Sequence, residues 1–312
     1  MKGLLALVAV VATASFASTA AAAGPAVVYD NTPHPLPGNL PSWAFEATGA
    51  SEFGDRVGFA TGSARELQTI SVVLSSWGCQ AGHWYSGDCV TVPGAAFTHS
   101  ITLNVYAVGP GASPGALLAT VTQTFTIPYR PSADPVNCMD GRWFDAASGV
   151  CFNGKAVTIT FDFTSHGVTL PDEVIVSVAY DTTHYGYSPI GESAACYSSP
   201  GGCGYDSLNV GLADPATTLS AGSNPAPADA YQDTRYSSCT DGAIDPFGLD
   251  GGCWTGFKPA IEIVAVTPPV APPTNKEQCK KGGWQTFDSP SFPNQGACEK
   301  YVKDAQSPGG EL

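Results

Sequence analysis

The chain has 312 residues, and 27 acidic against 13 basic side chains give it a formal net charge of −14. This balance leaves no basic surface to neutralise phosphates, which excludes a typical nucleic-acid-binding protein. Only 13% of the residues are charged and 43% are apolar, which excludes an intrinsically disordered chain. The 35 glycines and 26 prolines are too many for a helical bundle.

Residues 1–23 have the features of a secretory signal peptide. Lys2 supplies the positive charge, the segment 4–11 forms the apolar core, and three alanines precede a cleavage site at Gly24. The apolar core is too short to span a bilayer, and no later stretch of about 18 apolar residues occurs. We therefore expect a secreted, extracellular protein without a membrane span after removal of the signal.

The ten cysteines fall into five local pairs. The two members of a pair are at most 19 residues apart, whereas neighbouring pairs are separated by at least 26 residues. In an exported chain this spacing favours five disulfides, each closing its own loop. The expected bridges are Cys79–Cys89, Cys138–Cys151, Cys196–Cys203, Cys239–Cys253 and Cys279–Cys298. A zinc site would need a Cys-x-x-Cys pair or a suitably spaced His, and neither occurs.

Several segments between residues 24 and 266 alternate apolar and polar side chains, as expected for strands with one buried face. The alternation is cleanest at 101–108, where Ile101, Leu103, Val105 and Ala107 share a face. The other segments are 67–74, 117–127, 157–163, 174–180, 208–212 and 260–266. Gly- and Pro-rich turns separate them, without helical stretches. The sequence therefore predicts an all-β domain over 24–266, a two-sheet antiparallel β-sandwich that is jelly-roll-like.

Residues 267–275 form a Pro-rich linker, since four of the eight residues from Thr267 to Thr274 are proline. Beyond it, residues 276–312 are predicted to form a small helical hairpin. Thr274 and Glu277 match a capping box for a first helix, and Asn294 can cap a second one. The Cys279–Cys298 bridge would join the two helices, as so short a segment requires.

Two stretches of the body, ITLNVYAVGPGASPGALLATVTQT (101–124) and ITFDFTSHGVTLPDEVIVSVAY (159–180), resemble paired-strand units of secreted bacterial jelly-roll ectodomains of unknown function. The tail, with CKKGGW followed by FPNQGACEKYV, is similar to a short C-terminal Cys-stapled module common in secreted proteins of soil bacteria. The resemblance implies an exported β-sandwich followed by a terminal module. It assigns no activity and no functional residue.

Catalytic motifs do not occur. The chain has no G-x-S-x-G and no H-E-x-x-H, and none of its five histidines lies in a recognisable catalytic frame. A carboxylate pair for glycoside hydrolysis stays open because its spacing is set in three dimensions. We therefore predict a non-catalytic protein, with an unrecognised hydrolase as an alternative.

A calcium ion is the only cofactor for which the sequence offers a candidate site. Asp241, Asp245 and Asp250 lie in the Gly-rich loop between Cys239 and Cys253. Carboxylates are the ligands that calcium prefers, although this spacing matches no EF-hand. A solvated turn without an ion is the alternative interpretation.

Aromatic side chains gather inside the first bridged loop and around the third. Aromatic side chains that also carry a polar group can bind hydrated ligands such as polysaccharides. The candidate ligand-binding residues are Trp84, Tyr85, Tyr185, Tyr187, Tyr197 and Tyr205. The alternative is that these rings pack over the ends of the sheets. We predict a binding or surface-associated protein with extracellular polysaccharide or the cell surface as partner, or alternatively a purely structural protein without a ligand.

Overall fold

The computed structural model describes residues 24–82, 84, 86–181, 208–237, 239, 242–267, 270–287 and 290–306. The chain divides into two compact units, Gly24–Pro268 and a C-terminal unit that begins at Pro269. This boundary falls within the predicted linker 267–275. The predicted signal peptide (1–23) and the predicted Cys196–Cys203 bridge lie outside the described residues.

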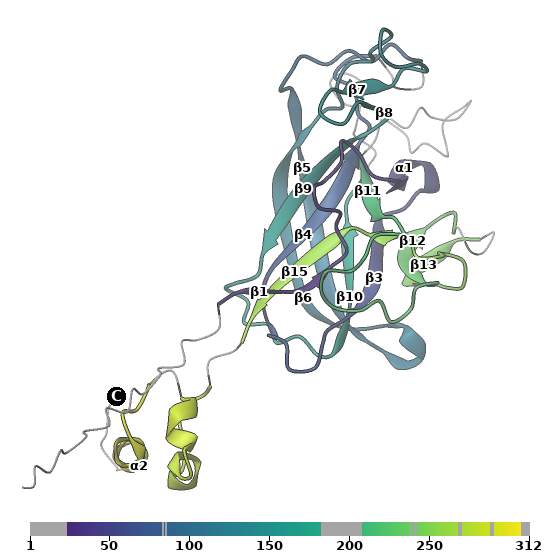
Figure 1. The fold of residues 1–312 in the computed structure, drawn as a ribbon. Helices are drawn as coiled ribbons and strands as arrows, with labels where there is room; N and C mark the ends of the chain where they lie inside the picture. The colour runs from purple at the N-terminus through teal and green to yellow at the C-terminus, as the bar shows by residue number, and fades with distance from the viewer. Residues whose placement is uncertain are drawn as a thin grey trace, which may run out of the picture. The chain divides into compact units, whose positions relative to one another are not determined.

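The Gly24–Pro268 unit is mostly β, and its described strand pairs are antiparallel (Figure 1). The strands of its first sheet run in the order β1 (Ala26–Asp30), β15 (Ile261–Val266), β4 (Glu66–Ser76), β11 (Leu208–Ala213) and β14 (Lys258–Pro259). In addition, β2 (Ser42–Trp43) pairs with β11, and β9 (Lys155–Asp162) pairs with β4. The first strand of the unit thus lies beside its last strand.

The second sheet has the order β13 (Ile244–Asp250), β12 (Ala230–Thr234), β3 (Glu52–Gly58), β10 (Glu173–Ala179), β5 (Ala96–Val108) and β6 (Pro114–Pro128). A separate hairpin consists of β7 (Trp143–Asp145) and β8 (Val150–Phe152). The helical elements described in this unit are α1 (Phe45–Thr48) and the 3₁₀ helix η1 (Pro110–Ala112).

The two sheets share one apolar core, so that their arrangement is sandwich-like. Buried side chains of β4 and β15, such as Ile70 and Ile263, belong to the same cluster as Leu103 of β5 and Val176 of β10. Each predicted strand segment overlaps an observed strand. The predicted alternation is confirmed in β5, where Leu103 and its same-face neighbours 101 and 105 are fully buried.

β3 was not among the predicted strands, because a charged and a small residue interrupt its apolar pattern. Phe53 and Val57 are fully buried, but Asp55 lies between them on the same face. Gly54 faces β10 so closely that a Cβ atom would lie 2.4 Å from Val176 O. Only glycine therefore allows the two strands to approach to this distance.

Four of the five predicted disulfides lie in the described residues, and all four are confirmed. Their Cα–Cα distances of 5.3 to 5.8 Å are typical of bridged cysteines. Bridges of this kind persist in an oxidising environment. No helix in the described part of the chain is long and apolar enough to cross a membrane.

The C-terminal unit contains the 3₁₀ helices η3 (Lys276–Cys279) and η4 (Gly283–Thr286) and one α-helix, α2 (Gln295–Ala305). The first predicted α-helix is thus only a short 3₁₀ turn in the described residues. The capping box that starts it lies one residue later than predicted, since Gln278 N donates to the N-cap Asn275 (3.2 Å) and Gln278 Oε1 accepts from the Asn275 N–H (3.1 Å).

The predicted cap of the second helix is confirmed. Asn294 Oδ1 accepts from Ala297 N (2.9 Å) at the start of α2. The buried face of α2 carries Cys298 and Val302, which pack with Cys279 and Phe287 into a small core of this unit. The disulfide therefore lies at the centre of the apolar contacts that order the tail.

Candidate functional site

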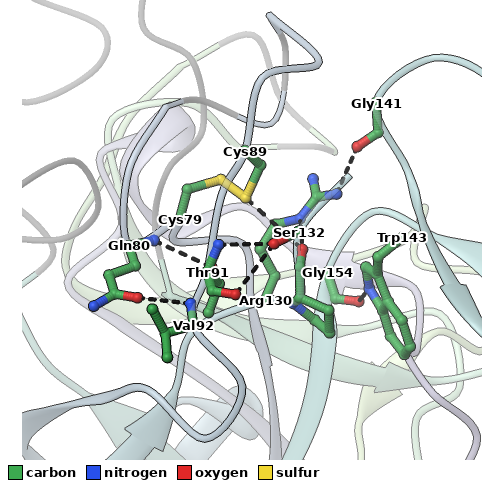
Figure 2. Close-up of a disulfide and its surroundings, with 11 residues drawn as sticks. Cys79, Gln80, Cys89, Thr91, Val92, Arg130, Ser132, Gly141, Trp143 and Gly154 are labelled. Carbon is green, nitrogen blue, oxygen red and sulfur yellow. Dashed lines mark hydrogen bonds between the residues drawn. A yellow bond between two sulfur atoms is a disulfide. The ribbon is translucent and has the colours of Figure 1, made fainter. Parts of the chain in front are cut away.

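Arg130 connects two of the disulfide-bridged loops of the Gly24–Pro268 unit. Its backbone N–H donates to Gly78 O (2.9 Å), next to the loop closed by Cys79–Cys89. Its side chain crosses to the loop closed by Cys138–Cys151, where Nη2 donates to Gly141 O (2.6 Å) (Figure 2). We call these two loops and the residues that adjoin them, residues 77–93 and 130–154, the bridged region.

The guanidinium of Arg130 is buried between these loops. The residue is 0% exposed, and its Nη1 has no hydrogen-bond partner within the described residues. Burial lowers the pKa of Arg130 to about 10, because the charged form loses hydration. Ser132, two residues later, accepts from Thr91 N (2.9 Å) and donates to Thr91 O (3.1 Å). These contacts fix the bridged region at several points.

A cleft of about 390 Å³ opens beside the bridged region. Aromatic and polar side chains line it together. The lining residues are Asn39, Leu40, Pro41, Ser42, Trp77, Arg142, Cys151, Phe152 and Asn153. Such a combination of apolar surface with a few hydrogen-bonding groups is typical of small-molecule and glycan sites.

The indole of Trp77 is held in place by a chain of hydrogen bonds. Its Nε1 donates to Ser75 Oγ (2.9 Å), and Ser75 Oγ donates to Asn39 Oδ1 (2.7 Å). A Cβ atom on Gly154 would lie 2.4 Å from Ser75 Oγ and 2.6 Å from Trp77 Nε1. The absence of a side chain at Gly154 therefore makes room for the indole.

Phe152, on the cleft lining, rests against a buried tryptophan. The ring of Trp143 lies 5.5 Å from that of Phe152, and its Nε1 donates to Gly154 O (2.7 Å). A Cβ atom on Gly38 would lie 2.6 Å from the Phe152 ring. The position of Phe152 is thus set by one indole and one glycine.

Trp84, a predicted ligand-binding residue, packs against Trp77 of this cleft but is not part of its lining. Its ring meets that of Trp77 edge to face, with centroids 4.7 Å apart. Trp77 and Phe152 were not among the predicted site residues, although each is near a cysteine of the two bridges, and this proximity is the signal that could have found them. The other predicted aromatic residues lie outside the described residues: Tyr85, Tyr185, Tyr187, Tyr197 and Tyr205.

A second cleft of about 560 Å³ borders the same region. Tyr129 and Lys155 contribute to its lining, but most of the remaining lining residues are proline, alanine, glycine and small polar residues. The smaller cleft therefore offers the richer set of aromatic and hydrogen-bonding groups, and we take it as the candidate site.

Comparisons with protein-family models, with curated proteins and with solved structures find no match to this chain.

Two of the three predicted calcium ligands, Asp245 and Asp250, lie in the described residues, near opposite ends of β13. Asp245 is exposed near the start of β13, and Asp250 is buried at its end. Asp250 accepts hydrogen bonds from Ser237 Oγ (2.6 Å), Trp254 Nε1 (3.3 Å) and Gln232 Nε2. Its oxygens are thus occupied by donors of the protein, and Asp241 lies outside the described residues.

A different group of possible metal ligands is present in the described residues. One ligand atom each of Asp30, His34 and Glu262 lies within 4.8 Å of the others. The pairing of β1 with β15 places Asp30 opposite Glu262. Asp30 already accepts from Thr32 Oγ1 (2.6 Å), Ser220 Oγ (2.6 Å) and His34 Nε2 (3.0 Å), so its carboxylate is satisfied by the protein.

These hydrogen bonds have an electrostatic consequence. Burial by itself would raise the pKa of Asp30, but hydrogen bonds from Ser220, Thr32 and His34 outweigh it, and the net pKa lies below the usual value. A folded-state pKa below that of the unfolded chain stabilises the protein at neutral pH, and this contribution disappears on acidification through the folded pKa.

We expect Asp30→Asn to lower the free energy of unfolding by about 2 kcal/mol at pH 7, since hydrogen bonds to a charged acceptor are lost. The difference from the wild type should shrink as the pH falls below about 4. Urea unfolding of the wild type and the variant at pH 7 and at pH 3 measures this difference in the free energy of unfolding. Asp214→Asn is the control, because this exposed carboxylate accepts one local bond, from Ala216 N. An equal loss at pH 3 and pH 7 would contradict the assignment.

Proposed function

We propose that this chain is an exported, non-catalytic binding protein with a jelly-roll-like sandwich, and that the cleft beside Trp77 and Phe152 takes a neutral extracellular polysaccharide. The observation that carries the proposal is the composition of the cleft, in which two aromatic side chains stand beside Asn39, Arg142 and Asn153. The signal-peptide pattern of residues 1–23 and the disulfides support export.

The chemistry of a sugar chain matches this lining. The C–H faces of pyranose rings pack on aromatic rings, while their hydroxyl groups exchange hydrogen bonds with amide and guanidinium groups. The formal net charge of −14 disfavours a strongly anionic polysaccharide, because the protein would repel it. A neutral glycan is therefore the class that fits best.

Crosslinks and hydrogen bonds hold the walls of the cleft, which favours binding to a flexible ligand. Two disulfides and the Arg130 contacts hold the bridged region, and Gly38 and Gly154 leave room for the rings of Phe152 and Trp77. A preformed site avoids the entropy loss of ordering its own side chains when the ligand binds.

Exposed apolar side chains on the bridged region support a role in contact with a surface. Val90 and Val92 follow the first bridge, and Val136 and Met139 flank a cysteine of the second. All four are largely exposed, Val136 by 88%. Apolar groups that protrude from bridged loops are typical of interaction surfaces.

A glycan array with matched variants tests the proposal. We expect Trp77→Ala and Asn153→Ala each to weaken binding of the recognised glycan at least about tenfold, since each removes a contact group worth about 1.4 kcal/mol or more. Gln123→Ala, which removes an exposed amide on β6, should bind as the wild type does. Far-UV and near-UV circular dichroism verifies that the variants are folded.

Each alternative has its own result in this experiment. A wild-type array without signal over neutral polysaccharides would favour the purely structural protein. Release of reducing sugars from a bound glycan would favour the hydrolase. Binding that survives Trp77→Ala and Asn153→Ala would place the site elsewhere than in this cleft.

A further inference from the structure

A lysine and an aspartate, neither of which lines the proposed glycan site, meet between the two sheets. Lys258 belongs to β14 of the first sheet and Asp55 to β3 of the second. Their side chains are 2% and 1% exposed, and Lys258 Nζ lies 3.1 Å from Asp55 Oδ1. The two residues are 203 positions apart in the sequence.

The surroundings of this pair exclude water. On the same face of β3, Asp55 is flanked by Phe53 and Val57, both fully buried. Phe53 packs against Trp254, with ring centroids 5.3 Å apart. The groups therefore face each other in a medium where charged forms lose their hydration.

As an ion pair, this arrangement is incompletely satisfied. Lys258 Nζ donates to Asp55 Oδ1 and to Ala226 O (2.9 Å). The second carboxylate oxygen of Asp55, Oδ2, has no hydrogen-bond partner in the described part of the chain. A buried ion pair is stabilising only when its remaining polar atoms are well bonded, because desolvation of each ion costs several kcal/mol.

We propose that Lys258 and Asp55 are joined by an intramolecular isopeptide bond that forms spontaneously after folding. The ammonium of Lys258 first gives a proton to the Asp55 carboxylate. The neutral amine then attacks Cγ of the carboxylic acid, an N–C bond forms, and the hydroxyl leaves with a proton from the nitrogen as one molecule of water. No oxidant, cofactor or second protein is required.

The product fits the hydrogen-bond partners that are present. The amide keeps one N–H, and the carbonyl oxygen of Ala226 already lies at 2.9 Å from the nitrogen to accept it. One oxygen of Asp55 leaves, so that the carboxylate no longer has two buried oxygens to satisfy. Condensation therefore replaces two buried charges by one neutral amide.

Burial moves the protonation equilibrium of Asp55 toward the carboxylic acid, the form that the amine attacks. Burial raises the pKa of Asp55 to about 6, although the positive charge of Lys258 opposes the rise. The hydroxyl of Tyr29 is buried in the same region, where burial and the charges of Asp55 and Asp30 raise its pKa far above the usual value. Tyr29 thus stays neutral and adds no negative charge beside the carboxyl group of Asp55.

Mass spectrometry of the full chain, reduced and alkylated, tests the proposal directly. We expect a mass about 18 Da below that of the mature sequence, the mass of one water molecule. Proteolysis should yield a branched peptide in which the segment that contains Asp55 is linked to the one that contains Lys258. A wild-type protein with the full sequence mass overturns the proposal, whatever its variants do.

Variants assign the bond to these two side chains. Lys258→Met and Asp55→Ala should restore the full mass, whereas Asp55→Asn should still condense, with loss of ammonia instead of water. Lys280 and Glu277 are an internal control, because their N–O distance is only 2.6 Å but their side chains are 46% and 78% exposed. A mass deficit that maps to this exposed pair, or that survives Lys258→Met, contradicts the assignment.

Discussion

Reduction of the disulfides is expected to lower the melting temperature of the Gly24–Pro268 unit by about 20 °C or more. A bridge across about 15 residues contributes about 3 kcal/mol by restricting the unfolded chain. The bridges of this unit that are described close loops of 10, 13 and 14 residues. These loops bury few apolar side chains, so the crosslinks replace stabilisation that burial does not supply.

Differential scanning calorimetry with and without dithiothreitol measures this effect. For a single bridge, Cys138→Ala with Cys151→Ala should lower the melting temperature by about 10 °C. Cys279→Ala with Cys298→Ala should instead expose residues 270–306 to proteases, because the bridge lies in the core of the C-terminal unit. An unchanged melting temperature, with all thiols titrating as free, would refute the role given to the bridges.

Asp250→Ala is expected to lower the free energy of unfolding by about 4 kcal/mol and the melting temperature by about 10 °C. The carboxylate of Asp250 accepts from Gln232, Ser237 and Trp254, and its removal takes the acceptor away from the buried donors of Gln232 and Trp254. Removal of a buried acceptor that serves several donors is among the point mutations that lower the free energy of unfolding most.

The same variant separates a structural carboxylate from a calcium ligand. We expect EDTA and added calcium to leave the melting temperatures of the wild type and of Asp250→Ala unchanged. Asp245→Ala is the matched control, since Asp245 is exposed on the same strand, and its loss should be within about 0.5 kcal/mol. If calcium raised the melting temperature of the wild type but of neither variant, the loop between Cys239 and Cys253 would be a calcium site after all.

The strands with regular alternation could be predicted from sequence because their pattern is local. The segment 101–108 lies inside β5, and 157–163 overlaps β9, since each presents an apolar face to the core at period two. The local spacing of the cysteines was sufficient for the four described bridges. The Asn294 cap was predictable for the same reason, since donor and acceptor are three residues apart.

Features that depend on distant partners could not be predicted. From the sequence alone, Asp55 in the middle of β3 is expected at the surface. Its burial is explained only by the contact with Lys258, which is distant in the sequence. The candidate cleft joins Asn39 to Trp77 and Phe152, which come together only when the sheets have formed. Asp250 looked like a calcium ligand because sequence shows its charge but not the three donors that occupy it.

The position of β1 beside β15 has a consequence for how the protein is made. Asn31, directly after β1, donates to Pro259 O (2.9 Å) and accepts from Ile261 N (2.8 Å). The strand that emerges first from the ribosome therefore finds its neighbour only when residue 266 has been synthesised. Such long-range pairing slows folding, and any translation product that stops earlier exposes the unpaired edge of β4 to aggregation.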